Sequence, residues 1–242
     1  MNRRACGVVV AVCGSVGSVL AQPCDPRWIS GGVPALNGTA YSTVMWDRDG
    51  AGPLPPALVV GGSFTLAGST AVSNLALWDG VEWSDIGGGV SGTVHGPTAI
   101  NALAVMVNGD LVVGGAFETA GSGGGAMAAN CIARFDGSVW SRMQQGTPQL
   151  GSSVLKLGVR PNGDLIALGY PFVNDDNTIA GPLARWNDQV SARWSDVPGV
   201  PPDMSYRTFT VLANGDVVVG GVPGSSPGSS ARRACRPCSC PP

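Results

Sequence analysis

The sequence predicts an all-β fold: a β-propeller-like array of four-stranded antiparallel blades. The turn Asn-Gly-Asp occurs at residues 108–110, 162–164 and 214–216, at spacings of 54 and then 52 residues. An apolar run ending in glycine recurs with it, from Leu58, Leu111, Leu165 and Val217. No stretch of the mature chain has a sustained helical apolar period with caps. Copies at a period of about 53 residues predict one continuous array rather than separate domains.

Each copy contains four short segments of strand character, which in the central copy cover 100–107, 110–117, 130–135 and 139–143. Asn108-Gly109 joins the first two, and Asp136-Gly137 joins the last two. Both pairs favour a type I′ turn, in which both central residues take positive φ. Asp79-Gly80 occupies the same place in the preceding copy, and the weaker Asn187-Asp188 in the next.

The second strand of each copy is apolar without alternation, as at Leu111-Val112-Val113. This pattern is typical of a strand that is buried on both faces, which happens when four-stranded sheets stack around an axis as propeller blades. We expect the large rings of the third and fourth strands to fill the wedge between sheets. The recurring positions are Gly61, Gly62, Gly114, Gly115, Asn108, Gly109, Asp110, Asn162, Gly163, Asp164, Asn214, Gly215, Asp216, Asp79, Gly80, Asp136, Gly137, Trp78, Trp83, Phe135, Trp140, Trp186 and Trp194.

The copies are unequal. Three full blades are expected at about 41–86, 99–143 and 152–197, within a repeat domain spanning 22–222. A fourth is incomplete: 205–221 supplies inner strands, and 27–30, with Trp28, resembles an outer strand. Pairing an N-terminal strand with C-terminal strands is one way to close a ring without an exposed edge. Residues 223–242 form a low-complexity tail, which suggests a truncated or frame-shifted member of a longer family.

The units LVVGG…LWDGVEW (58–83) and LVVGG…RFDGSVW (111–140) resemble blades of kelch-type β-propellers. The whole unit, with NGDLVVGGAF and NCIARFDGSVW, is similar to the delta-sixty-type repeats of secreted bacterial propeller-like proteins. The resemblance covers about 41–221 and implies a propeller fold. It implies no particular activity, because most proteins of that family have none assigned.

Residues 1–21 have the features of a secretory signal, with Arg3 and Arg4 before an apolar stretch and Val19-Leu20-Ala21 before the expected cleavage point. That stretch is short for a spanning helix, so we expect a secreted, periplasmic or cell-surface protein without a membrane span after cleavage. Five cysteines remain after cleavage, three of them in the last eight residues, and they do not suggest a disulfide framework. The low charge content and the absence of a basic run argue against nucleic-acid binding.

Loops after the second and fourth strands are expected at one end of the array, opposite the tight turns. Because loops on a rigid frame often bind ligands, the candidate binding residues are Tyr170, Asn174, Asp175, Asp176, Asn177, Glu118 and His95. Residues 174–177 offer oxygen ligands for Ca²⁺, although a solvated loop tip is the simpler interpretation. The expected partner is a protein or a glycan.

No catalytic or metal site is predicted. His95 is the single histidine, which excludes a multi-histidine centre, and Glu82 and Glu118 are the only glutamates. The CxxC of the tail, Cys235 to Cys238, has no second ligand pair. We therefore expect a non-catalytic binding protein. The alternatives are a lectin-like glycan-binding module, a nonfunctional remnant of a longer propeller, and a carboxylate-based hydrolase or lyase that uses Asp175 or Asp176.

Overall fold

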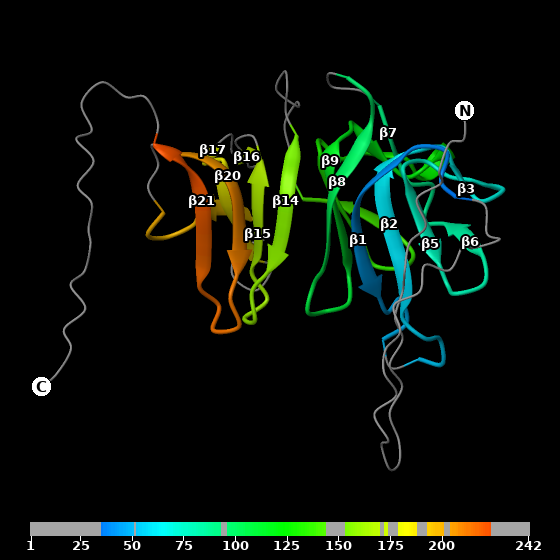
Figure 1. The fold of residues 1–242 in the computed structure, drawn as a ribbon, viewed down its shortest axis with the longest axis horizontal. Coiled ribbons are helices and arrows are strands. Elements are labelled where there is room, and N and C mark those ends of the chain that lie inside the picture. Colours follow the sequence, from blue (N-terminus) through cyan, green and yellow to red (C-terminus); the bar gives the residue numbers. More distant parts are fainter. Residues whose placement is uncertain are drawn as a thin grey trace, which may run out of the picture.

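The computed structural model describes residues 35–50, 52–92, 96–143, 153–169, 172–173, 179–187, 193–200 and 204–223. These residues form three four-stranded antiparallel sheets followed by a strand pair (Figure 1). The first sheet contains β1 (Thr39–Trp46), β2 (Ala57–Ser63), β5 (Leu75–Trp78) and β6 (Trp83–Asp85). The second sheet contains β8 (Ala99–Val105), β9 (Leu111–Ala116), β12 (Ile132–Phe135) and β13 (Trp140–Arg142). The third sheet contains β14 (Val154–Val159), β15 (Leu165–Gly169), β18 (Leu183–Asn187) and β19 (Arg193–Asp196). The terminal pair is β20 (Met204–Val211) and β21 (Val217–Pro223).

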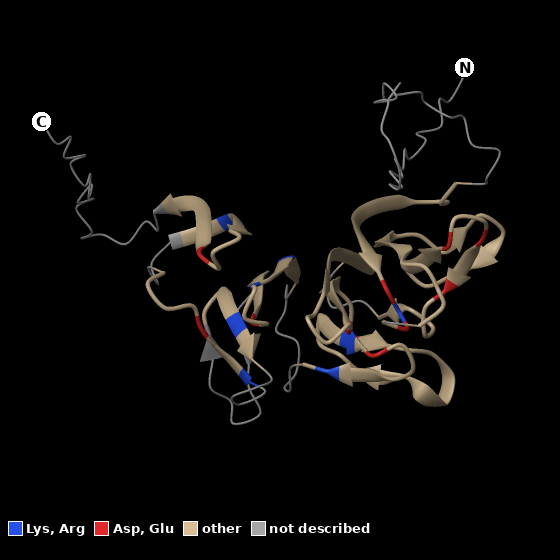
Figure 2. Cartoon of the chain, turned by 90° about the horizontal axis from the view of Figure 1, so that it is seen from below, with Lys and Arg blue, Asp and Glu red and all other residues tan. Residues whose placement is uncertain are grey.

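The predicted all-β class and the four-stranded sheet of each full copy are confirmed. Within each sheet the strands pair in chain order, so the first strand of the copy lies at one edge and its fourth strand at the other. The first strands also stand side by side from sheet to sheet, β1 beside β8, β8 beside β14 and β14 beside β20. The sheets follow one another along an arc, with the first sheet and the terminal pair at its two ends (Figure 2). Segment 27–30 lies outside the described residues.

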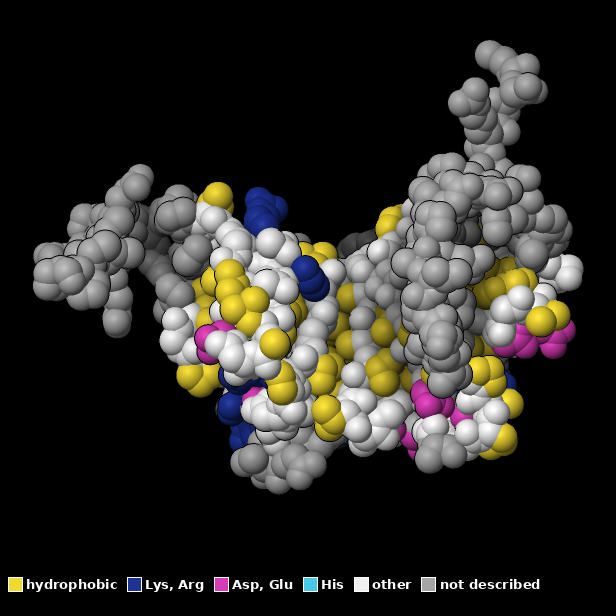
Figure 3. All heavy atoms as spheres, turned by 60° about the horizontal axis from the view of Figure 1, so that its bottom comes forward, with side chains coloured by type: hydrophobic (Ala, Val, Ile, Leu, Met, Phe, Trp, Pro, Cys, Tyr) yellow, Lys and Arg dark blue, Asp and Glu magenta, His cyan; other side chains and the backbone are white. Residues whose placement is uncertain are grey.

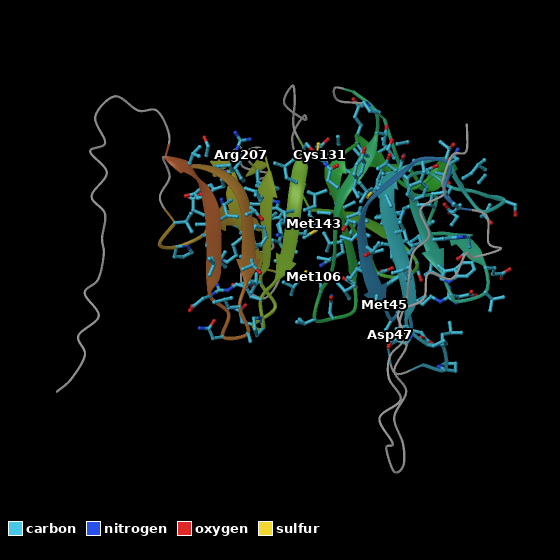
Figure 4. The ribbon with its side chains drawn as sticks, in the orientation of Figure 1. Met45, Asp47, Met106, Cys131, Met143 and Arg207 are labelled. Carbon is cyan, nitrogen blue, oxygen red and sulfur yellow. The ribbon has the colours of Figure 1, made fainter. Side chains whose placement is uncertain are left out.

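The second strand of each sheet is buried on both faces, as its unbroken apolar run predicts. In β9, Leu111 and Val113 pack against the first sheet, whereas Val112 packs against the third. In β15, Ile166 faces the terminal pair while Leu165 faces the second sheet. Met106, Cys131 and Met143 lie in the layer between the second and third sheets (Figure 4). The apolar layers on both sides of β9 and β15 are therefore each shared by two successive sheets.

The glycine doublets allow this close stacking. A Cβ on Gly61 would lie 2.5 Å from Ile100 Cγ2 of the next sheet, and a Cβ on Gly114 would lie 2.6 Å from Val154 Cγ1. The second glycine of the doublet faces the sheet's own first strand, where a Cβ on Gly115 would lie 2.0 Å from the Ala99 carbonyl oxygen. The first glycine thus sets the distance between sheets, and the second lies beside the β-bulge of the first strand.

The predicted type I′ turns are wrong. Gly109 has a φ of +91°, but Asn108 is not among the residues with positive φ. The Gly109 N–H donates to the Met106 carbonyl at 3.0 Å, so a three-residue loop ends on a left-handed glycine, as in a type I turn with a bulge. Asn108 keeps an ordinary φ because its side chain accepts a hydrogen bond from the Asp110 N–H at 3.2 Å. In the Asp-Gly turns, likewise, only the glycine has positive φ.

The expected packing of large rings between sheets is found at two of the layers. Trp140 packs on Phe135 against the first sheet, with ring centroids 4.8 Å apart. Trp194 stacks on Phe172 at 4.3 Å in the layer between the second and third sheets. Trp83 belongs instead to a cluster on the face of the first sheet that points away from the second.

Candidate binding face

The two ends of the sheets differ in construction. One end carries the tight turns between first and second strands, whereas the other carries the long connections that leave the second strands (Figure 1). These connections form small sheets of their own from β3 (Leu66–Ala67) and β4 (Thr70–Ala71), from β10 (Thr119–Ala120) and β11 (Met127–Ala128), and from β16 (Phe172–Val173) and β17 (Ile179–Ala180). We call this loop-bearing end the loop face. Its position agrees with the prediction, but its internal strands were not predicted.

A three-stranded sheet links the first and second sheets on the loop face. The chain leaving the first sheet forms β7 (Val90–Ser91), which pairs with β10, and β10 pairs with β11. Val90 and Ala120 are fully buried beneath it. Outside, the Ser91 and Thr119 hydroxyls are 2.7 Å apart and share a hydrogen bond. The loop after β9 is thereby held by the preceding sheet as well as by its own.

The corresponding loop of the first sheet is held by Asn37. Its side-chain oxygen accepts hydrogen bonds from the backbone N–H groups of Thr65 and Leu66, both at 2.9 Å. Its amide nitrogen donates to Thr65 Oγ1 at 2.9 Å. Leu36 forms a β-bridge with Ala67. Both described loops are therefore fastened by the segment that precedes their sheet.

Asn74 lies beneath the loop face and was missed by sequence reasoning. It is buried, with a φ of +65°. Its side-chain oxygen accepts from the Phe64 N–H at 3.2 Å, and its amide donates to the Val90 carbonyl at 3.0 Å. One side chain thus ties the loop after β2 to β7. The only signal in the sequence is an asparagine directly before an apolar third strand, which does not distinguish a buried linking residue from an ordinary turn residue.

Of the candidate binding residues, only Glu118 lies among the described residues. Glu118 is exposed on the loop face, beside β10. Its N–H donates to the Ser91 carbonyl at 3.0 Å, and its own carbonyl accepts from the Ala129 N–H at 2.8 Å. The structure therefore holds the Glu118 backbone on both sides and leaves its side chain at the surface. Tyr170, Asn174, Asp175, Asp176, Asn177 and His95 lie outside the described residues.

The surface around Glu118 consists of small and polar residues. Ser122 and Gly124 are exposed in the turn that follows β10, which contains the 3-10 helix η1 (Gly123–Gly125). The tryptophans among the described residues all lie in the larger sheets, not in these loops. Such a surface offers hydroxyls, backbone amides and the Glu118 carboxylate to a partner.

The carboxylates with perturbed pKa values lie at the opposite, turn end. Backbone N–H groups of Glu82 and Val81 donate to Asp79 Oδ1 at 2.8 Å and lower the pKa of that carboxyl. The same bonds from Val139 and Ser138 lower the pKa of Asp136. A carboxylate with a lowered pKa is a poorer general acid. These two aspartates are accounted for by turn structure.

Among buried ionisable groups, Asp164 lies in an ion-pair network and Cys131 lies in an apolar layer. The Asp164 carboxylate is 3.5 Å from Arg160 and 3.7 Å from Arg185, and it also accepts a hydrogen bond from Asn187. Burial raises the pKa of the Cys131 thiol, which makes it a weak nucleophile. Over the described ranges, no three His, Cys, Asp or Glu side chains gather in a way that could hold a metal ion.

Comparison with known proteins yields no match to a family model, to a curated protein or to a solved structure. In the described part of the chain, no helix has the length and apolar character needed to cross a membrane.

Proposed function

We propose that this chain is an exported, non-catalytic propeller-type scaffold whose loop face binds a protein. The observation that carries the proposal is the sheet of β7, β10 and β11, which fastens the loop around Glu118 to two successive sheets. Ordered loops lose less conformational entropy on binding, so a preorganised surface gains affinity. Among the described residues, the turn end carries no comparable small sheet.

The proposed architecture treats the three sheets as full blades and the terminal pair as part of a fourth. The stacked first strands and the apolar layers between sheets support this view. In the described residues β21 pairs with β20 alone. Figure 3 shows hydrophobic side chains over this part of the molecule, where Leu212, Val218 and Val222 are exposed. Segment 27–30 would supply the outer strand of that blade, as in the kelch-like and delta-sixty-type repeats that the sequence resembles.

The chemistry of the loop face favours a protein partner. Ser91, Thr119 and the exposed glycines present hydrogen-bonding groups without a large ring on which a sugar would stack. The Glu118 carboxylate would pair with a cationic side chain. Glycan binding through Tyr170 and hydrolysis through Asp175 or Asp176 are the competing outcomes of the test.

The test compares the unsubstituted chain with two variants on a printed array of purified extracellular proteins and on a glycan array. E118R changes the loop face, and V81R places the same charge on an exposed turn residue at the other end. We expect protein signals that fall at least tenfold for E118R and stay within twofold for V81R. Silence on the protein array, signals on glycans alone, or equal loss in both variants would refute the proposal. Release of sugar products from the glycan array would refute its non-catalytic part.

A further inference from the structure

One tryptophan hydrogen bond recurs between successive sheets. The Trp140 indole N–H of β13 donates to the Gly87 carbonyl, just beyond β6 of the preceding sheet, at 2.8 Å. The Trp194 indole N–H of β19 donates to the Met143 carbonyl, just beyond β13, at 2.7 Å. In each case the tryptophan of the fourth strand of one sheet donates to the backbone that follows the fourth strand of the preceding sheet.

Trp83 holds the same position in β6 of the first sheet, but it lacks this bond. Its indole nitrogen is buried and has no hydrogen-bond partner among the residues that the structure describes. Its ring packs on Trp78, with centroids 5.2 Å apart, next to the cluster that contains Phe64 and Ala67. Buried polar groups in native proteins are almost always paired. The orphaned nitrogen therefore indicates a carbonyl that the described residues do not contain.

The described chain shows where that carbonyl should come from. Leu36 bridges Ala67 in the first sheet as Val90 bridges Ala120 in the second. Leu36 thus occupies the position of Val90 relative to the next sheet. Because Gly87 lies three residues before Val90, the equivalent carbonyl lies about three residues before Leu36, within about 11 Å of extended chain.

The sequence before Leu36 matches this requirement. Trp28 precedes Leu36 by eight residues, and Trp83 precedes Val90 by seven. Gly31-Gly32 follows Trp28 as Gly87-Gly88 follows Trp83. We propose that residues 28–33, which lie outside the described residues, cover the Trp83 face of the first sheet and that a backbone carbonyl of 31–33 accepts the Trp83 indole N–H. The inference is independent of whether the terminal pair joins the same blade.

The occupant is a segment of this chain rather than a second copy, because Leu36 already brings the preceding residues to this face. Indole hydrogen exchange in the full chain, labelled with ¹⁵N-tryptophan, tests the proposal. W83F assigns the signal. We expect the Trp83 indole to exchange at a rate within tenfold of those of Trp140 and Trp194. W28S should accelerate the Trp83 exchange at least tenfold and leave Trp140 within twofold.

A second measurement needs no substitution. Nuclear Overhauser contacts should connect the Trp83 indole proton to α protons of 31–33 in the full chain. Their absence would overturn the proposal even if W28S fails to fold. Rapid exchange of the Trp83 indole, or exchange that W28S leaves unchanged, would also overturn it. Protection that rises with protein concentration would assign the face to a second copy instead.

Discussion

At the scale of single residues, the Asn-Gly-Asp turn links the first hairpin of a copy to its third strand. Asn162 donates to Asp164 Oδ2 at 3.0 Å and accepts from the Asp164 N–H at 3.2 Å. The same aspartate forms an ion pair with an arginine of the third strand. Asp164 pairs with Arg185, and Asp110 pairs with Arg134 at 3.3 Å. The first copy lacks the Asn-Gly-Asp turn and has Leu77 at the arginine position. The turn motif and the arginine therefore form one unit.

The turn aspartates should titrate below their usual range. Hydrogen bonds from backbone N–H groups favour the ionised forms of Asp79 and Asp136, so both folded-state pKa values lie below 3.8. Their contribution to stability is fully present above the unfolded pKa of about 3.9 and is lost as the pH falls through the lower folded values. Carboxyl carbon chemical shifts in an NMR titration measure both pKa values directly. A midpoint at or above 3.8 for either residue would contradict the turn geometry.

Asn74 should be costly to replace. N74A removes two side-chain hydrogen bonds in a buried position, and it places alanine at positive φ, so we expect a loss of about 2 to 3 kcal/mol in the free energy of unfolding. N74G removes the same hydrogen bonds but tolerates the backbone, and it should lose about 1 kcal/mol less than N74A. Urea denaturation of the three proteins measures both differences. Equal stability of N74A and the unsubstituted chain would show that Asn74 does not hold the loop face.

At the scale of elements, similar contacts between sheets are made by different side chains. A residue at the end of the first strand donates to the turn glycine that follows in the next hairpin. The Trp46 indole, at the last position of β1, donates to the Gly109 carbonyl at 2.8 Å, and Arg160 Nε, directly after β14, donates to the Gly215 carbonyl at 2.7 Å. The geometry repeats while the residue type changes. At the first two interfaces the close approach of backbone uses the same residue type, because Gly61 and Gly114 both face a β-branched side chain of the following sheet. In the third sheet Leu168 takes this position and packs against the terminal pair.

A single methyl group added at Gly114 should therefore increase the distance between the second and third sheets. A Cβ at Gly114 would lie 2.6 Å from Val154 Cγ1, so G114A forces the sheets apart and should cost about 1 to 3 kcal/mol. G124A is the matched control, because nothing lies within 4 Å of a Cβ at that exposed position. Chemical denaturation compares the two. A G114A variant as stable as G124A would mean that the glycine does not set the spacing.

At the scale of the whole molecule, the core is divided into layers that belong to pairs of sheets. The layer around Val59, Val113 and Phe117 joins the first and second sheets. The layer around Ala104, Leu165 and Trp194 joins the second and third. A third layer, with Leu168 and Phe209, joins the third sheet to the terminal pair. A fourth, smaller cluster around Val60 and Phe64 lies on the outer face of the first sheet. Because the three larger layers are shared, the stability of each sheet depends on its neighbours, as in other repeat arrays.

Heating should therefore unfold the sheets together. We expect far-ultraviolet and near-ultraviolet circular dichroism to follow one transition, because loss of one layer exposes both sheets that share it. Alkylation of Cys131, followed by peptide mass spectrometry, should become fast only in the same temperature range, since the thiol is buried between the second and third sheets. A broad melt with early Cys131 modification would instead indicate a nonfunctional remnant.

The sequence by itself determined the repeat, the strand class and the positions of the full sheets, because alternation, turn residues and glycine doublets are local signals. The unbroken run Leu111-Val112-Val113 already required burial on two faces. The predicted turn type was wrong because the prediction used only the dihedral preferences of Asn and Gly. In the structure, the Asn108 side chain accepts a hydrogen bond from the Asp110 N–H, which holds Asn108 at an ordinary φ. Only the tertiary structure decided the role of Asn74 and the joining of β7 to β10, since each depends on contacts between different segments of the chain that no local pattern records.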